Sequence, residues 1–83
     1  MKYSVYLIST KVKNKTTSYV GYTNNIKKRL KLHNSGKGAK FTRGRTWKLI
    51  YKENVKSKSK AISREYYIKK NRSLRTEIKN KEL

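Results

Sequence analysis

The stretch SYVGYTNN, residues 18–25, limits the fold more than any other part of the sequence. Residues 16–22 are rich in β-branched and aromatic side chains and therefore predict a strand, with Gly21 forming a turn close to its end. Thr23 or Asn24 can cap a helix directly afterwards, because a short polar side chain accepts a hydrogen bond from a free N–H of the first helical turn. A chain with this pattern passes from strand to helix through a very short connection.

A second strand precedes this stretch and is predicted to pair with it. Apolar and aromatic side chains recur with a period of two in residues 2–10, as in a strand with two different faces. The polar segment 11–15 is expected to form a hairpin loop around Asn14. The result is two antiparallel strands covered by the helix that ends near His33.

The remaining segments predict one more strand and two helices. Residues 47–51 form a further strand, and Ser57 can cap a helix over residues 58–70. Ser73 can cap a short last helix that runs through Ile78, after which the lysine-rich end is expected to fray.

All 83 residues are expected to form one small domain, ordered to about residue 79. Its fold class is α/β, more narrowly α+β: a three-stranded antiparallel sheet flanked by helices. The chain has no cysteine, so disulfides and zinc–thiolate sites are excluded. Disorder is the competing expectation for so polar a chain, but its seven tyrosines, Trp47 and Phe41 lie in periodic segments, which favours folding.

The net charge narrows the choice of partners. The sequence carries 24 Lys and Arg against four glutamates, a formal charge of +20. Such an excess repels itself unless a polyanion neutralises it, so nucleic acid or an anionic membrane is the expected partner. No apolar run approaches the roughly 18 residues of a membrane span, and no signal-peptide core follows Met1. These observations favour a cytoplasmic protein that binds nucleic acid and no membrane.

The helix after the turn carries two side chains suited to phosphate chemistry. Ile26, Leu30 and His33 share one of its faces, and Arg29 lies beside that face. Arg29 and His33 could also be an ordinary solvated helix edge. The loop beyond the helix is basic and is expected to follow the phosphates of a nucleic acid through Lys37, Lys40, Arg43 and Arg45.

Glu65 is an interior carboxylate in a chain with very few acids. It lies among positions expected to face the core, namely Ala61, Ile62, Tyr66 and Ile68. A lone carboxylate is costly there unless it has a function. The alternative is that Glu65 pairs with Lys69, four residues later, on an exposed helix face.

The order of these elements and residues resembles the GIY-YIG endonuclease domain over nearly the whole chain. The two half-motifs of that domain are matched by Ser4-Val5-Tyr6 and by Tyr19-Val20-Gly21. The family's helix arginine, the frequent histidine one turn later and the metal-binding glutamate fall on Arg29, His33 and Glu65.

The similarity is greatest to small stand-alone bacterial members of the YhbQ/YazA type, which are related to the nuclease domain of UvrC. It rests on the run from Gly21 to Asn25 and on its continuation through residues 29–39. Two positions depart from the family pattern. Ser4 stands where the name-giving glycine would be, and Tyr22 stands where UvrC-like members have lysine.

The resemblance implies an endonuclease that hydrolyses DNA phosphodiester bonds with one divalent ion, Mg²⁺ or Mn²⁺, held by Glu65. Arg29 would contact the scissile phosphate. Tyr6, Tyr19 and His33 would handle protons, with the general base left open between Tyr6 and His33. A strongly cationic pocket with a metal is expected to favour the phenolate form of the tyrosines. The residues implied to support the site are Gly21 and Tyr22.

The implied partner is DNA, whether branched, flapped or single-stranded, in repair or recombination; RNA is less favoured and a protein partner is left open. Two alternatives belong to other classes: a non-catalytic DNA- or RNA-binding protein that keeps the fold, and an RNA-associated basic protein of ribosomal type. Tyr6 and Tyr19 would then be a cross-strand aromatic pair that fills a thin core. Metal-dependent cleavage separates the first hypothesis from the other two.

Overall fold

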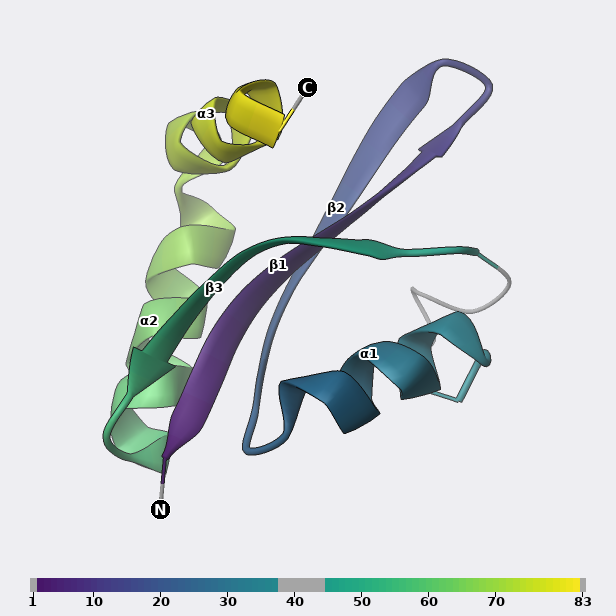
Figure 1. The fold of residues 1–83 in the computed structure, drawn as a ribbon. Coiled ribbons are helices and arrows are strands. Elements are labelled where there is room, and N and C mark those ends of the chain that lie inside the picture. The colour runs from purple at the N-terminus through teal and green to yellow at the C-terminus, as the bar shows by residue number, and fades with distance from the viewer. Residues whose placement is uncertain (1, 38–44, 83) are drawn as a thin grey trace.

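The computed structural model describes residues 2–37 and 45–82. A three-stranded antiparallel sheet is covered by one helix on one face and by two on the other (Figure 1), which confirms the expected α+β class. The elements in chain order are β1 (Tyr3–Val12), β2 (Lys15–Thr23), α1 (Ile26–Asn34), β3 (Lys48–Val55), α2 (Lys58–Lys70) and α3 (Arg72–Glu82).

The central strand of the sheet is β1, because the strand order is β2-β1-β3. Its side chains are accordingly the best buried, with Val5, Leu7 and Ile8 each at 0% exposure. The turn between β1 and β2 consists only of Lys13 and Asn14, which both have positive φ, at 51° and 67°. Two-residue turns of this handedness match the twist of paired strands. The loop predicted over residues 11–15 was therefore too long, and both strands extend into it.

Alternation along β1 divides the core between the two faces of the sheet. Val5 and Leu7 point toward α2 and α3, where they pack with Ala61 and Ile68. Tyr6 and Ile8 point to the other face of the sheet, toward α1. There they form a second cluster with Trp47 and with the partly buried side chains of Tyr19, Ile26, Leu30 and Leu49. The prediction that the first helix lies over the hairpin is confirmed.

Two helix caps differ from the predicted ones. Asn25, not Thr23 or Asn24, caps α1, and its side chain accepts a hydrogen bond from the backbone N–H of Lys28 at 3.1 Å. Thr23 instead accepts a bond from the backbone N–H of Asn25 at 3.1 Å, so it fixes the cap rather than acting as one.

The last two helices follow the same capping rule. Ser57 caps α2 as predicted. For α3 the side chain of Asn71 accepts the backbone N–H of Leu74 at 3.0 Å, so the helix begins one residue before the predicted cap Ser73 and continues to Glu82. None of the helices in the described ranges is long and apolar enough to cross a membrane.

The exposed face of α2 is more apolar than predicted. Ile62 is 46% exposed and Tyr66 57%, so these two residues do not widen the core face as expected. The helix meets the sheet only through a narrow stripe that includes Ala61 and Ile68. Tyr66 is covered instead by the ammonium group of Lys70, 4.7 Å from its ring centroid, which is a favourable cation–π contact at the surface.

Candidate active site

A cleft of about 420 Å³ lies against the edge strand β2 and is lined by residues from both faces of the sheet. Six of the residues singled out from the sequence line it: Tyr6, Tyr19, Gly21, Tyr22, Arg29 and Glu65. Arg29 comes from α1 and Glu65 from α2, so the cleft is the place where helices on opposite faces approach one strand edge.

Gly21 is required by a close approach and not by a turn. It lies inside β2, directly opposite Tyr6 on β1. A Cβ atom at Gly21 would come within 2.5 Å of the Tyr6 hydroxyl oxygen and 2.7 Å of ring atom Cζ. Since the positive-φ glycine of the described chain is Gly36, the predicted turn at Gly21 was wrong. The missing side chain is what allows the phenol of Tyr6 to lie across the backbone of β2.

Tyr6 and His33 form a buried polar pair beneath the cleft. The Tyr6 hydroxyl oxygen lies 2.7 Å from His33 Nε2, and the two residues are 2% and 1% exposed. The Tyr19 ring contacts the imidazole edge-on, with ring centroids 5.3 Å apart. His33 is thus part of the interior, whereas Arg29, one turn earlier, remains exposed at the cleft. The alternative of a solvated helix edge does not hold for His33.

Burial decides the protonation state of Tyr6 and of Tyr19 in the free protein. Burial raises the pKa of Tyr6, the neighbouring Tyr19 and Glu65 raise it further, and Arg29 opposes them only in part. Burial, and then Glu65, also raise the pKa of Tyr19. Both residues are therefore neutral phenols at neutral pH in the free protein. In the absence of a metal ion, desolvation outweighs the single guanidinium, so the expectation that a cationic pocket with a metal favours the phenolate stays a prediction for the metal-bound protein.

His33 is the neutral base of the pair. Burial lowers its pKa below the ordinary value of 6.5, and the positive charge of Arg29 lowers it further. In the tautomer that carries its proton on Nδ1, the unprotonated Nε2 accepts the hydrogen bond that the Tyr6 hydroxyl donates. This arrangement satisfies two buried polar groups at once.

We expect the protein to lose stability as the pH falls below about 6.5, because the unfolded state then binds a proton that folded His33 resists. The free energy of unfolding, measured by urea denaturation between about pH 7.5 and pH 5, should fall more in the wild type than in a His33→Gln variant, whose amide can still bond to Tyr6. Equal losses in the two proteins would contradict the assignment.

Glu65 faces the cleft and also touches a lysine. Its side chain is 21% exposed, and its Oε1 atom lies 3.9 Å from Nζ of Lys69, which is 65% exposed. The alternative of a surface pair is therefore present as a contact, but a loose pair with so exposed a lysine contributes little stability. The charge of Glu65 acts on both Tyr6 and Tyr19 across the cleft.

The residue before Glu65 links α2 to the sheet. Arg64 donates from Nε and Nη2 to the two carboxylate oxygens of Glu53 on β3, at 2.7 and 2.9 Å. This pairing is the main reason that the pKa of Glu53 is lowered. The Tyr51 hydroxyl donates to the same carboxylate at 2.7 Å. This bidentate pair adds to the packing of Ala61 and Ile68 that holds α2 on the sheet, with Glu65 at the cleft.

The donor set fits a hard divalent ion held by a single protein ligand. Within the described residues no three His, Cys, Asp or Glu side chains gather to form a metal site. Glu65 alone supplies an anionic oxygen at the cleft. Mg²⁺ commonly accepts one carboxylate while keeping water molecules and phosphate oxygens as its other ligands, and Mn²⁺ accepts carboxylate, carbonyl and water oxygens as well.

The sequence reasoning did not assign four of the lining residues to the site, namely Tyr3, Thr23, Asn24 and Lys58. Lys58 is the charged one among them. It is the first residue of α2 and lies seven residues before Glu65, so the two share a helix face. That spacing was the signal that could have identified it. Of the predicted loop cations, Lys37 and Arg45 are exposed and do not line the cleft, whereas Lys40 and Arg43 lie outside the described residues.

Comparison with known proteins shows which family the chain resembles. The GIY-YIG catalytic domain matches residues 2–79. The chain is 60% identical over 53 residues to a UPF0213 protein of Clostridium perfringens and 51% identical over 53 residues to the UPF0213 protein YazA of Bacillus subtilis. Each match covers 63% of this chain but only 57% and 54% of those relatives, so the chain spans a little over half of their length.

A solved structure shows the same fold. The solution NMR structure of the UPF0213 protein BH0048 from Bacillus halodurans matches with a TM-score of 0.53 and 35% sequence identity, over 96% of this chain and 84% of that one. A catalytic domain of the matched type points to a nuclease and implies a nucleic-acid substrate. The family follows from the match to nearly the whole chain: the protein belongs to the GIY-YIG family.

Proposed function

We propose that this protein is an endonuclease that cuts DNA with one divalent ion, Mg²⁺ or Mn²⁺, at Glu65. The observation that carries the proposal is the single cleft that brings together a guanidinium, a carboxylate and a phenol hydrogen-bonded to a neutral imidazole. Phosphodiester hydrolysis needs a charge partner for the phosphate, a metal ligand and a proton acceptor. Arg29, Glu65 and the Tyr6–His33 pair would supply these three in that order.

Arg29 is suited to bind the phosphate that is cut. Its side chain is exposed at the cleft, so it meets the substrate without any rearrangement of the core. A guanidinium offers a planar fork of donors that matches two phosphate oxygens and stabilises the charge that develops on them. A divalent ion held by Glu65 would add charge neutralisation on the phosphate oxygens and on the departing 3′-oxygen.

The buried pair offers a route for the proton of the attacking water. Tyr6 would take that proton on its hydroxyl oxygen while it passes its own proton to His33 Nε2, at a distance of 2.7 Å. The hydroxide so formed would attack phosphorus, and the bond from phosphorus to the 3′-oxygen would break with its electron pair passing to that oxygen. The 3′-oxygen would then take a proton from solvent, His33 would return its proton to solvent, and Tyr6 would remain neutral throughout. The raised pKa of Tyr6 then does not prevent catalysis, because the imidazole is the final acceptor.

Substrate binding would also improve the base. In the free protein the charge of Arg29 contributes to the lowered pKa of His33. A phosphate bound to Arg29 brings a negative charge that offsets this effect. His33 would therefore be a stronger base when a phosphodiester occupies the cleft than it is in the free protein.

The proposal is tested by incubating the purified protein with plasmid, linear duplex, single-stranded, flap and junction DNA, each with Mg²⁺, with Mn²⁺ and with EDTA. We expect cleavage with either metal and none with EDTA. Preference for the flap or junction would support a role in repair or recombination. Tight binding without cleavage of any substrate would instead favour a non-catalytic nucleic-acid-binding protein, and a matching RNA panel would identify a preference for RNA.

Lys58 should strengthen DNA binding, whereas Lys60 on the same helix should not. Both are exposed, but only Lys58 lines the cleft. Removing one charge-assisted bond to a phosphate costs about 1.5 kcal/mol, so Lys58→Gln is expected to weaken binding by about tenfold. It should also reduce the slope of log K against log salt by about 0.9. Lys60→Gln is the matched control, and equal effects of the two variants would contradict the assignment.

A further inference from the structure

A second hollow lies where β1 and β3 separate, and it shares no residue with the cleft. The β1–β3 pairing ends at Ser9 opposite Lys48, whereas the β1–β2 pairing continues to Val12 opposite Lys15. Beyond Ser9, no strand among residues 2–37 and 45–82 pairs with the side of β1 that faces away from β2. The space between the diverging strands is a notch of about 250 Å³.

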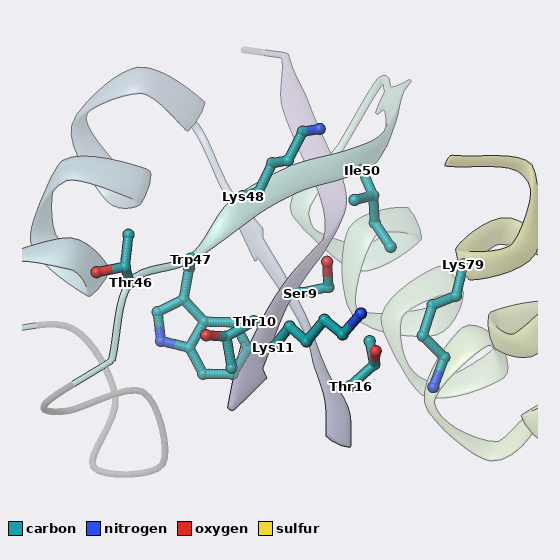
Figure 2. A pocket seen from close by; sticks show the side chains of 9 residues that line it. All are labelled: Ser9, Thr10, Lys11, Thr16, Thr46, Trp47, Lys48, Ile50 and Lys79. Carbon is teal, nitrogen blue, oxygen red and sulfur yellow. The ribbon is translucent and has the colours of Figure 1, made fainter. Parts of the chain in front are cut away.

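Three lysines from three different elements line this notch (Figure 2): Lys11 of β1, Lys48 of β3 and Lys79 of α3. None of its lining residues is acidic. The Lys11 and Lys79 side chains extend along the notch, whereas the Lys48 side chain extends to the other side of the β3 ribbon (Figure 2). Positive charges on side chains that lie close together repel one another and attract an anion.

The described carboxylates are engaged elsewhere. Glu53, Glu65 and Glu77 pair with other cations, namely Arg64, Lys69 and Lys81. None of these three glutamates lines the notch.

The other groups in the notch suit a phosphate of the nucleic acid better than a stacked nucleobase. Four of its lining residues carry a hydroxyl group, namely Ser9, Thr10, Thr16 and Thr46, and that of Thr46 points away from the notch (Figure 2). Ammonium and hydroxyl groups are the donors that bind phosphate oxygens without reading sequence. Trp47 lies at the side of the notch, but it is only 3% exposed and presents no open ring face for stacking. Duplex DNA, which exposes its phosphates and hides its bases, matches this chemistry better than a single strand.

We propose that the notch is a second contact site for duplex DNA, where the Lys11 and Lys79 side chains bind backbone phosphate and Lys48 adds positive charge at the edge of the notch. Tyr6 in the cleft and Lys11 in the notch are five residues apart on β1, which is roughly 17 Å along a strand. One phosphate therefore cannot occupy both sites. The inference rests on the nucleic-acid partner of the proposed function but is independent of cleavage.

Trp47 gives a direct signal for the notch because it is the only tryptophan in the chain. The experiment follows its single indole N–H resonance while a short DNA duplex is added in EDTA, so that no cleavage occurs. The notch variant carries Lys11→Gln, Lys48→Gln and Lys79→Gln. The control variant removes the same charge at Lys31, Lys52 and Lys60, also by glutamine, and these exposed lysines line neither the notch nor the cleft.

The duplex is expected to shift the Trp47 resonance in the wild type and in the control variant but not in the notch variant. The slope of log K against log salt should fall in the notch variant by about 0.9 for each phosphate that its side chains no longer neutralise. Three outcomes would overturn the proposal: no shift in the wild type, an undiminished shift in a folded notch variant, or the same shift with inorganic phosphate at equal concentration.

The two proposals fail in different ways. With Mg²⁺ and saturating duplex, the notch variant should cut at the wild-type rate, because no residue of the cleft has changed. Trp47 shifts without any cleavage would support the notch and contradict the nuclease. Cleavage without a Trp47 shift would contradict the notch and leave the nuclease standing.

Discussion

Glu65→Gln is expected to lower kcat for DNA cleavage about a thousandfold or more while DNA affinity in EDTA stays close to that of the wild type. Glutamine keeps the shape of the side chain but removes the anionic oxygen that would hold the divalent ion. Charge neutralisation by a metal is worth several kcal/mol in such reactions, and about 4 kcal/mol corresponds to a thousandfold in rate. The folded state should lose little, because the Lys69 contact at 3.9 Å is loose and exposed.

Glu77→Gln is a matched control for this substitution. Glu77 also lies 3.9 Å from a lysine four residues later, Lys81, but it is 65% exposed on α3 and does not line the cleft. Binding of Mn²⁺ alone, followed by paramagnetic broadening of the tyrosine resonances around the cleft, provides a readout that does not depend on activity. Broadening should disappear in Glu65→Gln and persist in Glu77→Gln. Undiminished cleavage by Glu65→Gln would refute the metal assignment.

The sequence predicted best the elements in which the order of apolar and polar side chains follows which face is buried. Alternation in β1 is visible because Val5 and Leu7 pack on α2 and α3 while Tyr6 and Ile8 pack on α1. The bounds of α2 follow from a local signal, the Ser57 side chain. The end of the hairpin was harder to place, because a two-residue turn with positive φ is compatible with several polar pairs in a lysine-rich segment.

The sequence indicated which side chains lie near one another in the cleft better than it indicated their protonation states. Arg29 and Glu65 could be identified from their places in the sequence, and the structure brings both to one cleft. The neutral state of Tyr6 could not be, because it depends on burial beneath α1 and on a hydrogen bond to a residue 27 positions away. Ser4 shows the opposite case: its hydroxyl donates to Asn54 across the sheet at 3.0 Å, so this strand position has no need of glycine.

Gly21 makes room for the Tyr6 ring and does not form the predicted turn. A substitution at this position is therefore expected to have a large effect. Gly21→Ala is expected to destabilise the protein by about 1 to 3 kcal/mol and to separate Tyr6 from His33. The new methyl group would overlap the Tyr6 hydroxyl and ring. The ring cannot turn away cheaply, because Tyr6 is 2% exposed and bonded to His33. Cleavage should fall along with stability, since the proton route is broken.

A double-mutant cycle tests whether Tyr6 is the cause. In a Tyr6→Leu background the shorter side chain no longer reaches Gly21, so the added cost of Gly21→Ala should be within a few tenths of a kcal/mol of zero. The control is Gly36→Ala, which is strained by its φ of 81° and should cost the same in both backgrounds. Urea unfolding measures all of these variants. If Gly21→Ala costs as much with leucine at position 6 as with tyrosine, the glycine serves the backbone of β2 and not the approach of the phenol.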